Sequence, residues 1–382
     1  MLGRQLLLRR ESLGIADAVR RVVALQAQQP ASPYLALWNR LTDFDPADLD
    51  AAFAGHEVVK ATLMRITLHA VHTGDYRAFR EAMEPTLRAV AHRAGRFTAS
   101  GLTVADADAL VLDLVASADR PRTTAEMGAW LEQRLGAPLD PRVWQGLRVY
   151  APLLHAPTHA PWSFGARPMF VAARSQPVLA DLDDTQATPE PLRGGVPAAA
   201  LQTLVKRYLE GFGPASVADV AQFALVQRAR VKEALKTLSG DLERLEGPDG
   251  FPLYDVPDAP RPPEDTPAPP RLMAMWDSIL LAYVDRSRVI PPDYRRLVIQ
   301  SNGDVLPTML VDGYVAGVWR SVEGGIEATA FHRLADDAWE GLAAEARSLV
   351  AFLADREPKV YRRYGHWWRT LPSAEVRLFP GD

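Results

Sequence analysis

Three glutamines stand close together near the N-terminus, in the run Gln26-Ala27-Gln28-Gln29-Pro30. Positions i and i+2 share a face only in extended backbone, because they point in different directions on a helix. The prolines at 30 and 33 favour a helix end before them, so we expect the carboxamides of Gln26 and Gln28 to meet. A carboxamide does not titrate near neutral pH, but it donates and accepts hydrogen bonds at once and can hold a water molecule. The alternative is a polar loop that caps a helix.

Residues 64–70 form a second candidate group. Apolar and polar side chains alternate there, which is typical of a strand with Arg65, Thr67 and His69 on its polar face. These three residues are either core groups that hydrogen-bond to one another or ligands that act beside the glutamines. His69 and His72 face opposite sides of such a strand, and no acidic partner stands at ligand spacing. We therefore expect no metal site.

The composition excludes several classes of function. The chain of 382 residues is 48% hydrophobic and 24% charged, as in ordinary globular proteins, and it has no cysteine. Thiol nucleophiles, disulfides and Cys-ligated zinc are therefore excluded. No run of 18 or more apolar residues is present, so we expect no membrane span and a cytoplasmic, nucleoid-associated protein. The sequence contains no Gly-rich phosphate loop and no dinucleotide fingerprint, and we expect no cofactor.

The net charge of −4 argues against nucleic-acid binding, but the charges are unevenly distributed. Residues 60–96 and 356–369 each carry a local net charge of +4, and residues 286–300 hold four arginines against one aspartate. The acidic residues gather in 241–265. This distribution is compatible with a basic groove, although a charged run is more often a solvated face.

The expected secondary structure repeats one order three times, namely three helices followed by short strands, which is typical of a winged-helix module. The first helices are expected at 12–25, from Ser32 and from Asp45, where Pro46 follows the cap, and they lead to a strand at 64–70. In the second repeat we expect helices at 104–116, from Thr123, and from Asp140 to about 154, followed by strands at 162–164 and 169–171. In the third repeat we expect helices at 198–211, from Ser216, and at 227–238, followed by strands at 242–245 and 252–256.

A different region follows the repeats. Residues 257–270 contain seven prolines and predict an extended connector. Beyond it the chain is mainly β to about residue 334, with a hairpin turn at Asp312-Gly313 and a helix at 336–354. We therefore predict an α+β protein with a winged helix bearing the glutamines (1–98), a second winged helix (99–173), a linker and third winged helix (174–256), the connector (257–270) and a β-rich C-terminal region with a terminal helix (271–382).

Three motifs together resemble the AlkZ/YcaQ family of bacterial winged-helix DNA glycosylases. They are the Gln-x-Gln element at 26–28, the strand at 65–69, and the C-terminal patterns at 285–288 and 302–307. The resemblance implies three winged helices in a C-shaped arrangement around double-stranded DNA. It also implies excision of N7-alkylated purines, including bulky adducts and interstrand crosslinks. The second glutamine matches the AlkZ-like branch, which is associated with self-resistance in producers of genotoxic compounds.

The chemistry of a carboxamide pair agrees with that activity. An N7-alkylated guanine already carries positive charge and leaves as a neutral base, so Gln26 and Gln28 need only position a water or stabilise the sugar cation. No lysine stands near the motif except the distant Lys60, which favours a monofunctional hydrolase over a lyase, and we expect a monomer. The resemblance and the local charge together suggest DNA contacts at Arg65, Thr67, His69, Arg286, Arg288, Asn302, Trp319 and Arg320.

Alternatives remain for each of these assignments. Arg286 and Arg288 clamp a phosphate or pair with nearby aspartates, and the turn at Asp312-Gly313 is a DNA-probing finger or a plain sheet turn. The stretch 366–369 is core aromatic packing or a stacking platform. The rival function is a non-catalytic winged-helix regulator, which would show a preferred sequence and no base release. A third alternative is an enzyme that uses the glutamine loop on a substrate other than DNA.

Overall fold

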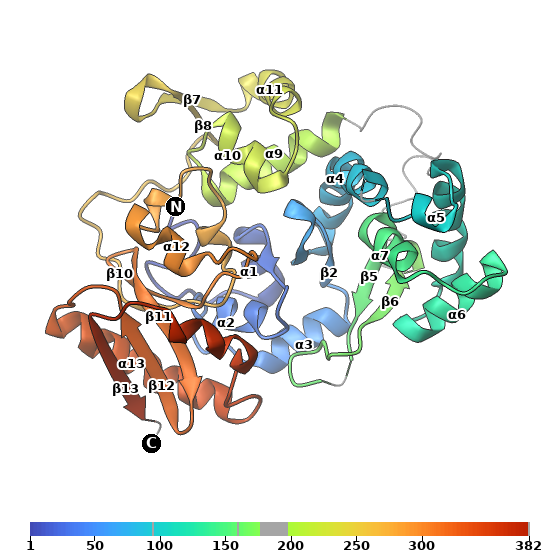
Figure 1. The fold of residues 1–382 in the computed structure, drawn as a ribbon. Coiled ribbons are helices and arrows are strands. Elements are labelled where there is room, and N and C mark those ends of the chain that lie inside the picture. Colours follow the sequence, from blue (N-terminus) through green and yellow to red (C-terminus); the bar gives the residue numbers. More distant parts are fainter. Residues whose placement is uncertain (94, 159, 176–197, 381–382) are drawn as a thin grey trace.

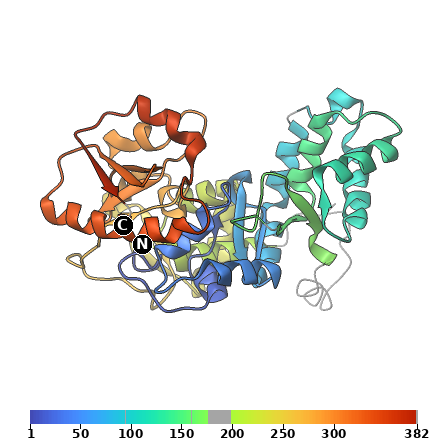
Figure 2. The same cartoon turned by 90° about the horizontal axis from the view of Figure 1, so that it is seen from below.

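The structure, a computed structural model, describes residues 1–93, 95–158, 160–175 and 198–380. It has the predicted mixed α+β architecture. Figure 1 shows the N-terminal elements (blue) between a second helical group (cyan to green) and the C-terminal sheet (orange to red). In Figure 2 these last two regions lie at opposite ends of the molecule. Nearly all of the predicted linker 174–197 lies outside the described residues.

The predicted order of three helices and a hairpin is present three times. Four of the predicted helix starts are confirmed, because Asp45, Thr123, Asp140 and Ser216 each accept a backbone N–H of the first turn. The elements are α1 (Ile15–Arg21), α2 (Ser32–Trp38), α3 (Pro46–Ala54), β2 (Val58–Thr62) and β3 (Leu68–His72), then α5 (Val104–Ser117), α6 (Thr124–Leu135), α7 (Pro141–Tyr150), β5 (Leu153–Ala156) and β6 (Met169–Ala172), then α9 (Ala198–Phe212), α10 (Val217–Ala224), α11 (Arg228–Thr237), β7 (Glu243–Glu246) and β8 (Pro252–Asp255).

Three local predictions were wrong. The strand expected at 64–70 is interrupted, because Arg65 and Ile66 have positive φ angles of 54° and 59° in a 3-10 turn between β2 and β3. The helix expected to reach 154 ends at Tyr150, since Pro152 disfavours helical backbone before it. Its first wing strand is therefore β5, and residues 162–164 are not a strand.

The hairpins of the first and second repeats form one sheet. Its strand order is β1-β3-β2-β5-β6-β4, where β1 (Leu25–Gln26) carries the first glutamine and β4 is Arg122–Thr123. Strand β2 pairs with β5 through Lys60 opposite His155. The expected boundary between residues 98 and 99 thus does not separate two sheets, and the division into modules stays a prediction.

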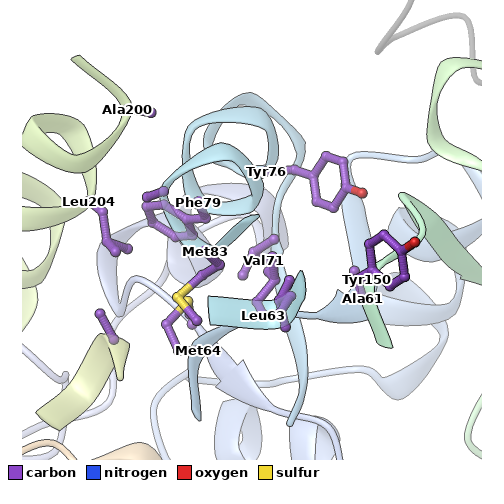
Figure 3. Packing of buried hydrophobic residues seen from close by; sticks show 14 of the residues in the cluster. Ala61, Leu63, Met64, Val71, Tyr76, Phe79, Met83, Tyr150, Ala200 and Leu204 are labelled. Atoms are coloured by element: carbon purple, nitrogen blue, oxygen red, sulfur yellow. The ribbon is translucent and has the colours of Figure 1, made fainter. Parts of the chain in front are cut away.

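The two faces of this sheet belong to different hydrophobic cores. One face packs against α4 (Thr73–Arg93), a 21-residue helix that the sequence reasoning missed, and against α9. The other face packs against the N-terminal helices and the C-terminal region. Figure 3 shows part of the first core, which includes Ala61, Leu63, Met64, Val71, Tyr76, Phe79, Met83, Tyr150, Ala200 and Leu204.

The C-terminal region contains a five-stranded antiparallel sheet of order β13-β12-β11-β10-β9, as the β-rich prediction requires. Its predicted hairpin turn is confirmed, because Asp312 and Gly313 join β10 to β11 with φ angles of 50° and 81°, values that suit a primed two-residue turn. The predicted helix is confirmed as α13 (Asp336–Ala354). The strands are β9 (Arg271–Leu272), β10 (Thr308–Val311), β11 (Tyr314–Val322), β12 (Gly325–Ala330) and β13 (Glu375–Pro380).

Buried polar contacts fasten the C-terminal region to the residues that flank α2. Arg40 makes two hydrogen bonds to the carboxylate of Asp277, of 2.8 and 2.9 Å, and both side chains are only 1% exposed. Asn39 donates to the carbonyl of Leu272 at 2.8 Å, and Ser278 donates to that of Ala24 at 2.9 Å. Within the described residues, no helix is long and apolar enough to cross a membrane.

Candidate active site

The glutamine loop begins in extended backbone, as its spacing predicted. In β1, Gln26 lies opposite His69 of β3, and the N–H of Ala27 donates to the carbonyl of Leu68 at 2.8 Å. The side chain of Gln26 is buried, whereas that of Gln28 is exposed. Both carboxamides approach β3, but only one of them is held tightly.

The carboxamide of Gln26 has a fixed orientation. Its Nε2 donates to Thr67 Oγ1 at 3.1 Å, and its Oε1 accepts from the Arg65 guanidinium at 2.5 Å. Thr67 donates its own hydroxyl proton to the carbonyl of Met64 at 3.1 Å, so its oxygen is left as an acceptor for Gln26. A flip of the amide would lose both contacts. In contrast, Gln28 accepts from the N–H of Leu68 at 3.5 Å, the upper limit for a hydrogen bond.

Arg65 connects the glutamine to two other elements. Its guanidinium lies 3.2 Å from His69 Nε2, and it is centred 5.2 Å from the ring of Phe223 in α10. The other ring nitrogen of His69 lies 3.1 Å from the carbonyl of Thr67, which requires a proton on Nδ1. Burial, aided by the charge of Arg65, holds the pKa of His69 well below its usual range. His69 is therefore neutral and accepts from Arg65.

The structure brings together five of the sequence-predicted residues and places the others elsewhere. Arg65, Thr67 and His69 surround Gln26, and Gln28 follows on the same loop. They act as a hydrogen-bonded group, although Arg65 reaches it from a turn and not from the expected strand face.

Arg286 and Arg288 lie in a 3-10 turn whose cap is Asp285. Arg286 is half-buried. Arg288 is exposed, stacks 4.5 Å from the ring centre of Tyr283 and donates to the carbonyl of Pro214 at 2.9 Å. The two arginines thus occupy different environments, which a two-residue spacing alone does not distinguish.

The prediction that Trp319 contacts DNA is wrong. Its side chain is 0% exposed and donates its indole N–H to the carbonyl of Met273 at 2.9 Å, so it packs in the C-terminal core and offers no surface to DNA. The neighbouring Arg320 is ion-paired with Glu327 at 2.7 Å. Asn302 is exposed and donates to Asp304 at 3.0 Å within its turn.

The C-terminal aromatic segment supports the glutamine loop, a role that sequence reasoning missed. Gln29 donates to the hydroxyl of Tyr364 at 2.8 Å, and Ser32 at the start of α2 shares a hydrogen bond of 2.9 Å with Tyr361. Tyr364 is buried and lies edge-on against Trp276. The bonded partners lie 335 and 329 residues apart in the sequence, so no local pattern announces these contacts.

Lys60 is separated from the glutamines by the sheet. It is in register with Ala70, which is in register with Leu25, while Gln26 pairs with His69. Cross-strand neighbours share a face and adjacent residues do not. The amine of Lys60 therefore lies on the face opposite Gln26, 4.2 Å from the ring centre of Phe164.

We expect Lys60→Met to stabilise the protein. Burial lowers the pKa of Lys60 to about 7, so at neutral pH folding carries a penalty on the order of 2–5 kcal/mol. Between pH 7 and the usual lysine range, the unfolded chain keeps this proton while the folded chain loses it, so wild-type stability rises with pH. Denaturant unfolding at pH 7 and 9 should show the advantage of the variant shrink by about 1.4 kcal/mol per pH unit. Lys359→Met, at a half-exposed site, is the control; an advantage independent of pH contradicts the expectation.

Comparison with known proteins is consistent with this arrangement. The family model described as DNA glycosylase AlkZ-like matches residues 19–352. The interstrand DNA cross-link repair glycosylase of Streptomyces sahachiroi is 26% identical over 350 residues, which are 86% of this chain and 88% of that protein. The solved structure of Streptomyces sahachiroi DNA glycosylase AlkZ aligns with a TM-score of 0.74 at 22% identity, over 93% of this chain and 95% of that one. The two chains therefore share a fold.

Proposed function

The chain belongs to the AlkZ-like family of DNA glycosylases, and from this premise we propose that it hydrolyses the N-glycosidic bond of N7-alkylated purines in double-stranded DNA. The family membership favours a glycosylase over a non-catalytic regulator. In the proposed reaction Gln26 and Gln28 are the catalytic residues, and the protein acts as a monomer without a metal or cofactor.

The fixed carboxamide of Gln26 is the observation that carries this proposal. Arg65 and Thr67 hold it in one orientation before substrate arrives, so it needs no reorganisation during the reaction. The exposed Gln28 is free to orient a water molecule toward C1′. Because an N7-alkylated base leaves as a neutral molecule, the reaction needs no acid, and the neutral His69 supplies none.

The position of Lys60 supports a monofunctional reaction. A lyase forms a Schiff base between an amine and the sugar. The Lys60 amine lies across the sheet from the glutamines and is buried, so it has no route to a sugar held beside Gln26. We propose that water is the nucleophile and that the product is an intact abasic site.

We further propose that bulky adducts and crosslinks are accepted. A relative is named an interstrand DNA cross-link repair glycosylase, and the exposure of Gln28 suits a substrate base that stays near the duplex. Arg65, Thr67 and His69 would line the reaction site, while Arg286, Arg288, Asn302 and Arg320 would face the DNA.

Release of free base tests the function directly. The protein is incubated with duplexes that contain N7-methylguanine or a nitrogen-mustard crosslink, and the freed base and the abasic sites are quantified. We expect release well above spontaneous depurination from both duplexes, with no strand nicking. Release no faster than in buffer from every substrate would overturn the proposal, and nicking through a covalent intermediate would overturn its monofunctional part.

Tyr364→Phe should slow catalysis without weakening binding. The change removes only the hydroxyl, which accepts from Gln29 and from Arg363. Loss of the bond from Gln29 costs about 1 kcal/mol and so predicts an approximately fivefold lower kcat. KM should stay unchanged, since neither residue is placed on the DNA. Single-turnover kinetics of Tyr364→Phe, Gln29→Ala and the double variant measure the effect. The double variant should be no slower than the worse single one; additive losses would mean that the two residues act separately.

A further inference from the structure

Arg65 is half-buried beside Gln26 and lacks the kind of partner that the buried arginines of this protein have. Elsewhere a carboxylate neutralises the guanidinium, as in the pairs Arg4–Asp255, Arg40–Asp277, Arg207–Asp75, Arg271–Glu345 and Arg356–Asp50. The hydrogen-bond partners of Arg65 are the amide of Gln26, the carbonyl of Phe223 and the ring of His69, all of them neutral. Across the described ranges, Arg65 has no ion pair.

Arg286 is a second cation without a counter-charge. Its Nε is buried and has no hydrogen-bond partner among the described residues, and no carboxylate there forms an ion pair with its guanidinium. The pKa of Arg65 is lowered to about 10 by burial and then by the charge of Arg286. Burial, followed by the charge of Arg295, also lowers the pKa of Arg286. Arg65 and the segment that leads to Arg286 both contact α10, because Arg65 lies against Phe223 and the N–H of Val284 donates to Asp219 at 3.0 Å.

Such an arrangement is unfavourable in the free protein. Taking a guanidinium partly out of water without a counter-charge costs free energy, and nearby like charges add to the cost. An anion that completes the hydrogen bonds of both guanidiniums removes the cost, and the planar fork of arginine matches the oxygens of a phosphate.

We propose that Arg65 and Arg286 form an anion site that binds a phosphodiester group of the DNA strand carrying the lesion. The inference rests on the proposed function and deepens it, because it assigns one phosphate to the reaction centre. Arg65 joins this phosphate to the Oε1 of Gln26 through a single guanidinium.

The bound phosphate also solves an electrostatic problem. Positive charge develops on the sugar as the glycosidic bond breaks, and an uncompensated Arg65 guanidinium next to Gln26 would oppose it. A phosphate between the guanidiniums and the sugar offsets part of their positive field at the sugar. The DNA itself then supplies the negative charge that a carboxylate supplies in sugar glycosidases.

A charge-deletion cycle tests the site. Arg286→Gln and Arg286→Lys are compared with wild type on lesion duplexes in which each phosphate within three positions of the lesion is replaced, one at a time, by an uncharged methylphosphonate. Affinity is measured at several salt concentrations. On unmodified DNA we expect Arg286→Gln to bind about tenfold more weakly with a salt slope lower by about one, and Arg286→Lys to recover part of the loss.

The decisive result is a lack of additivity. Methylphosphonate at one position should weaken DNA binding by the wild-type protein about tenfold and leave DNA binding by Arg286→Gln unaffected. Arg288→Gln is the matched control on the same turn. Relative to wild type, its DNA affinity should fall by the same factor on unmodified and on modified DNA, because Arg288 is held by Tyr283 and Pro214. Equal sensitivity of wild type and Arg286→Gln at every position would overturn the inference.

Two other outcomes also overturn it. Millimolar inorganic phosphate that protects the protein against heat in an Arg286-dependent manner, with no methylphosphonate effect, would mean that the site binds free anion only. A larger loss for Arg288→Gln than for Arg286→Gln would place the phosphate elsewhere. Because these measurements record binding, absence of base release would disprove the proposed function and leave this test intact.

Discussion

We expect that alanine at both Gln26 and Gln28 abolishes release of the alkylated base, while the protein still binds duplex DNA. Gln26→Ala alone removes the preorganised dipole and frees Arg65, and we expect its rate to fall by about 10²–10³-fold. Gln28→Ala should lower the rate of base release less, because the carboxamide of Gln28 is exposed and water partly replaces it. Single-turnover release from N7-methylguanine DNA measures both effects.

The control for this pair is Gln133→Ala, which removes the same group from an exposed position on α6. It should leave the rate unchanged. Circular dichroism and duplex affinity show whether the double variant remains folded and bound. A folded double variant that releases base at more than about a tenth of the wild-type rate would mean that other groups perform the reaction, since a preorganised donor contributes far more.

Asp277→Ala should cause a large loss of stability. The carboxylate neutralises Arg40 in a site where both side chains are 1% exposed, so its loss leaves a buried charge without a partner. Removing one member of such a pair costs about 3–5 kcal/mol. Denaturant unfolding, followed by tryptophan fluorescence, measures the loss in the free energy of unfolding. We expect both the α2 region and the C-terminal sheet to be destabilised.

A double variant separates charge from packing. Arg40→Met with Asp277→Leu fills the same space without charge and should recover most of the lost stability. Arg9→Ala, which breaks an exposed pair with Glu11 at 3.6 Å, should change the free energy of unfolding by less than about 1 kcal/mol. If Asp277→Ala falls in the same range as Arg9→Ala, the buried pair does not hold α2 to the C-terminal region.

Local chemistry in the sequence was sufficient for much of the fold. Cap residues such as Asp45 and Ser216 fix helix starts through bonds to the next few residues, and the Asp312-Gly313 turn needs only two positive φ angles. The helix α4 escaped prediction because its many charged residues and an internal Pro85 hide a modest apolar stripe. Its position becomes clear only from the sheet that it covers.

Local chemistry in the sequence also predicted part of the candidate site. The extended backbone at Gln26 follows from nearby prolines, and Thr67 and His69 were grouped by their spacing. The turn that aims Arg65 at Gln26 depends on positive φ angles at two non-glycine residues, which no propensity favours. The contacts of Gln29 with Tyr364, and of Arg65 with Phe223, join segments far apart in the chain and depend on tertiary packing.

The sheet shared by the first two repeats has a mechanical consequence. Backbone hydrogen bonds between β2 and β5 join the two hairpins in one sheet, so neither hairpin can rotate relative to the other without breaking these bonds. A protein built in this way cannot close on a duplex by hinging at that junction. For the proposed reaction we therefore expect deformation of the DNA to contribute, and lesions at steps that bend easily should be repaired fastest.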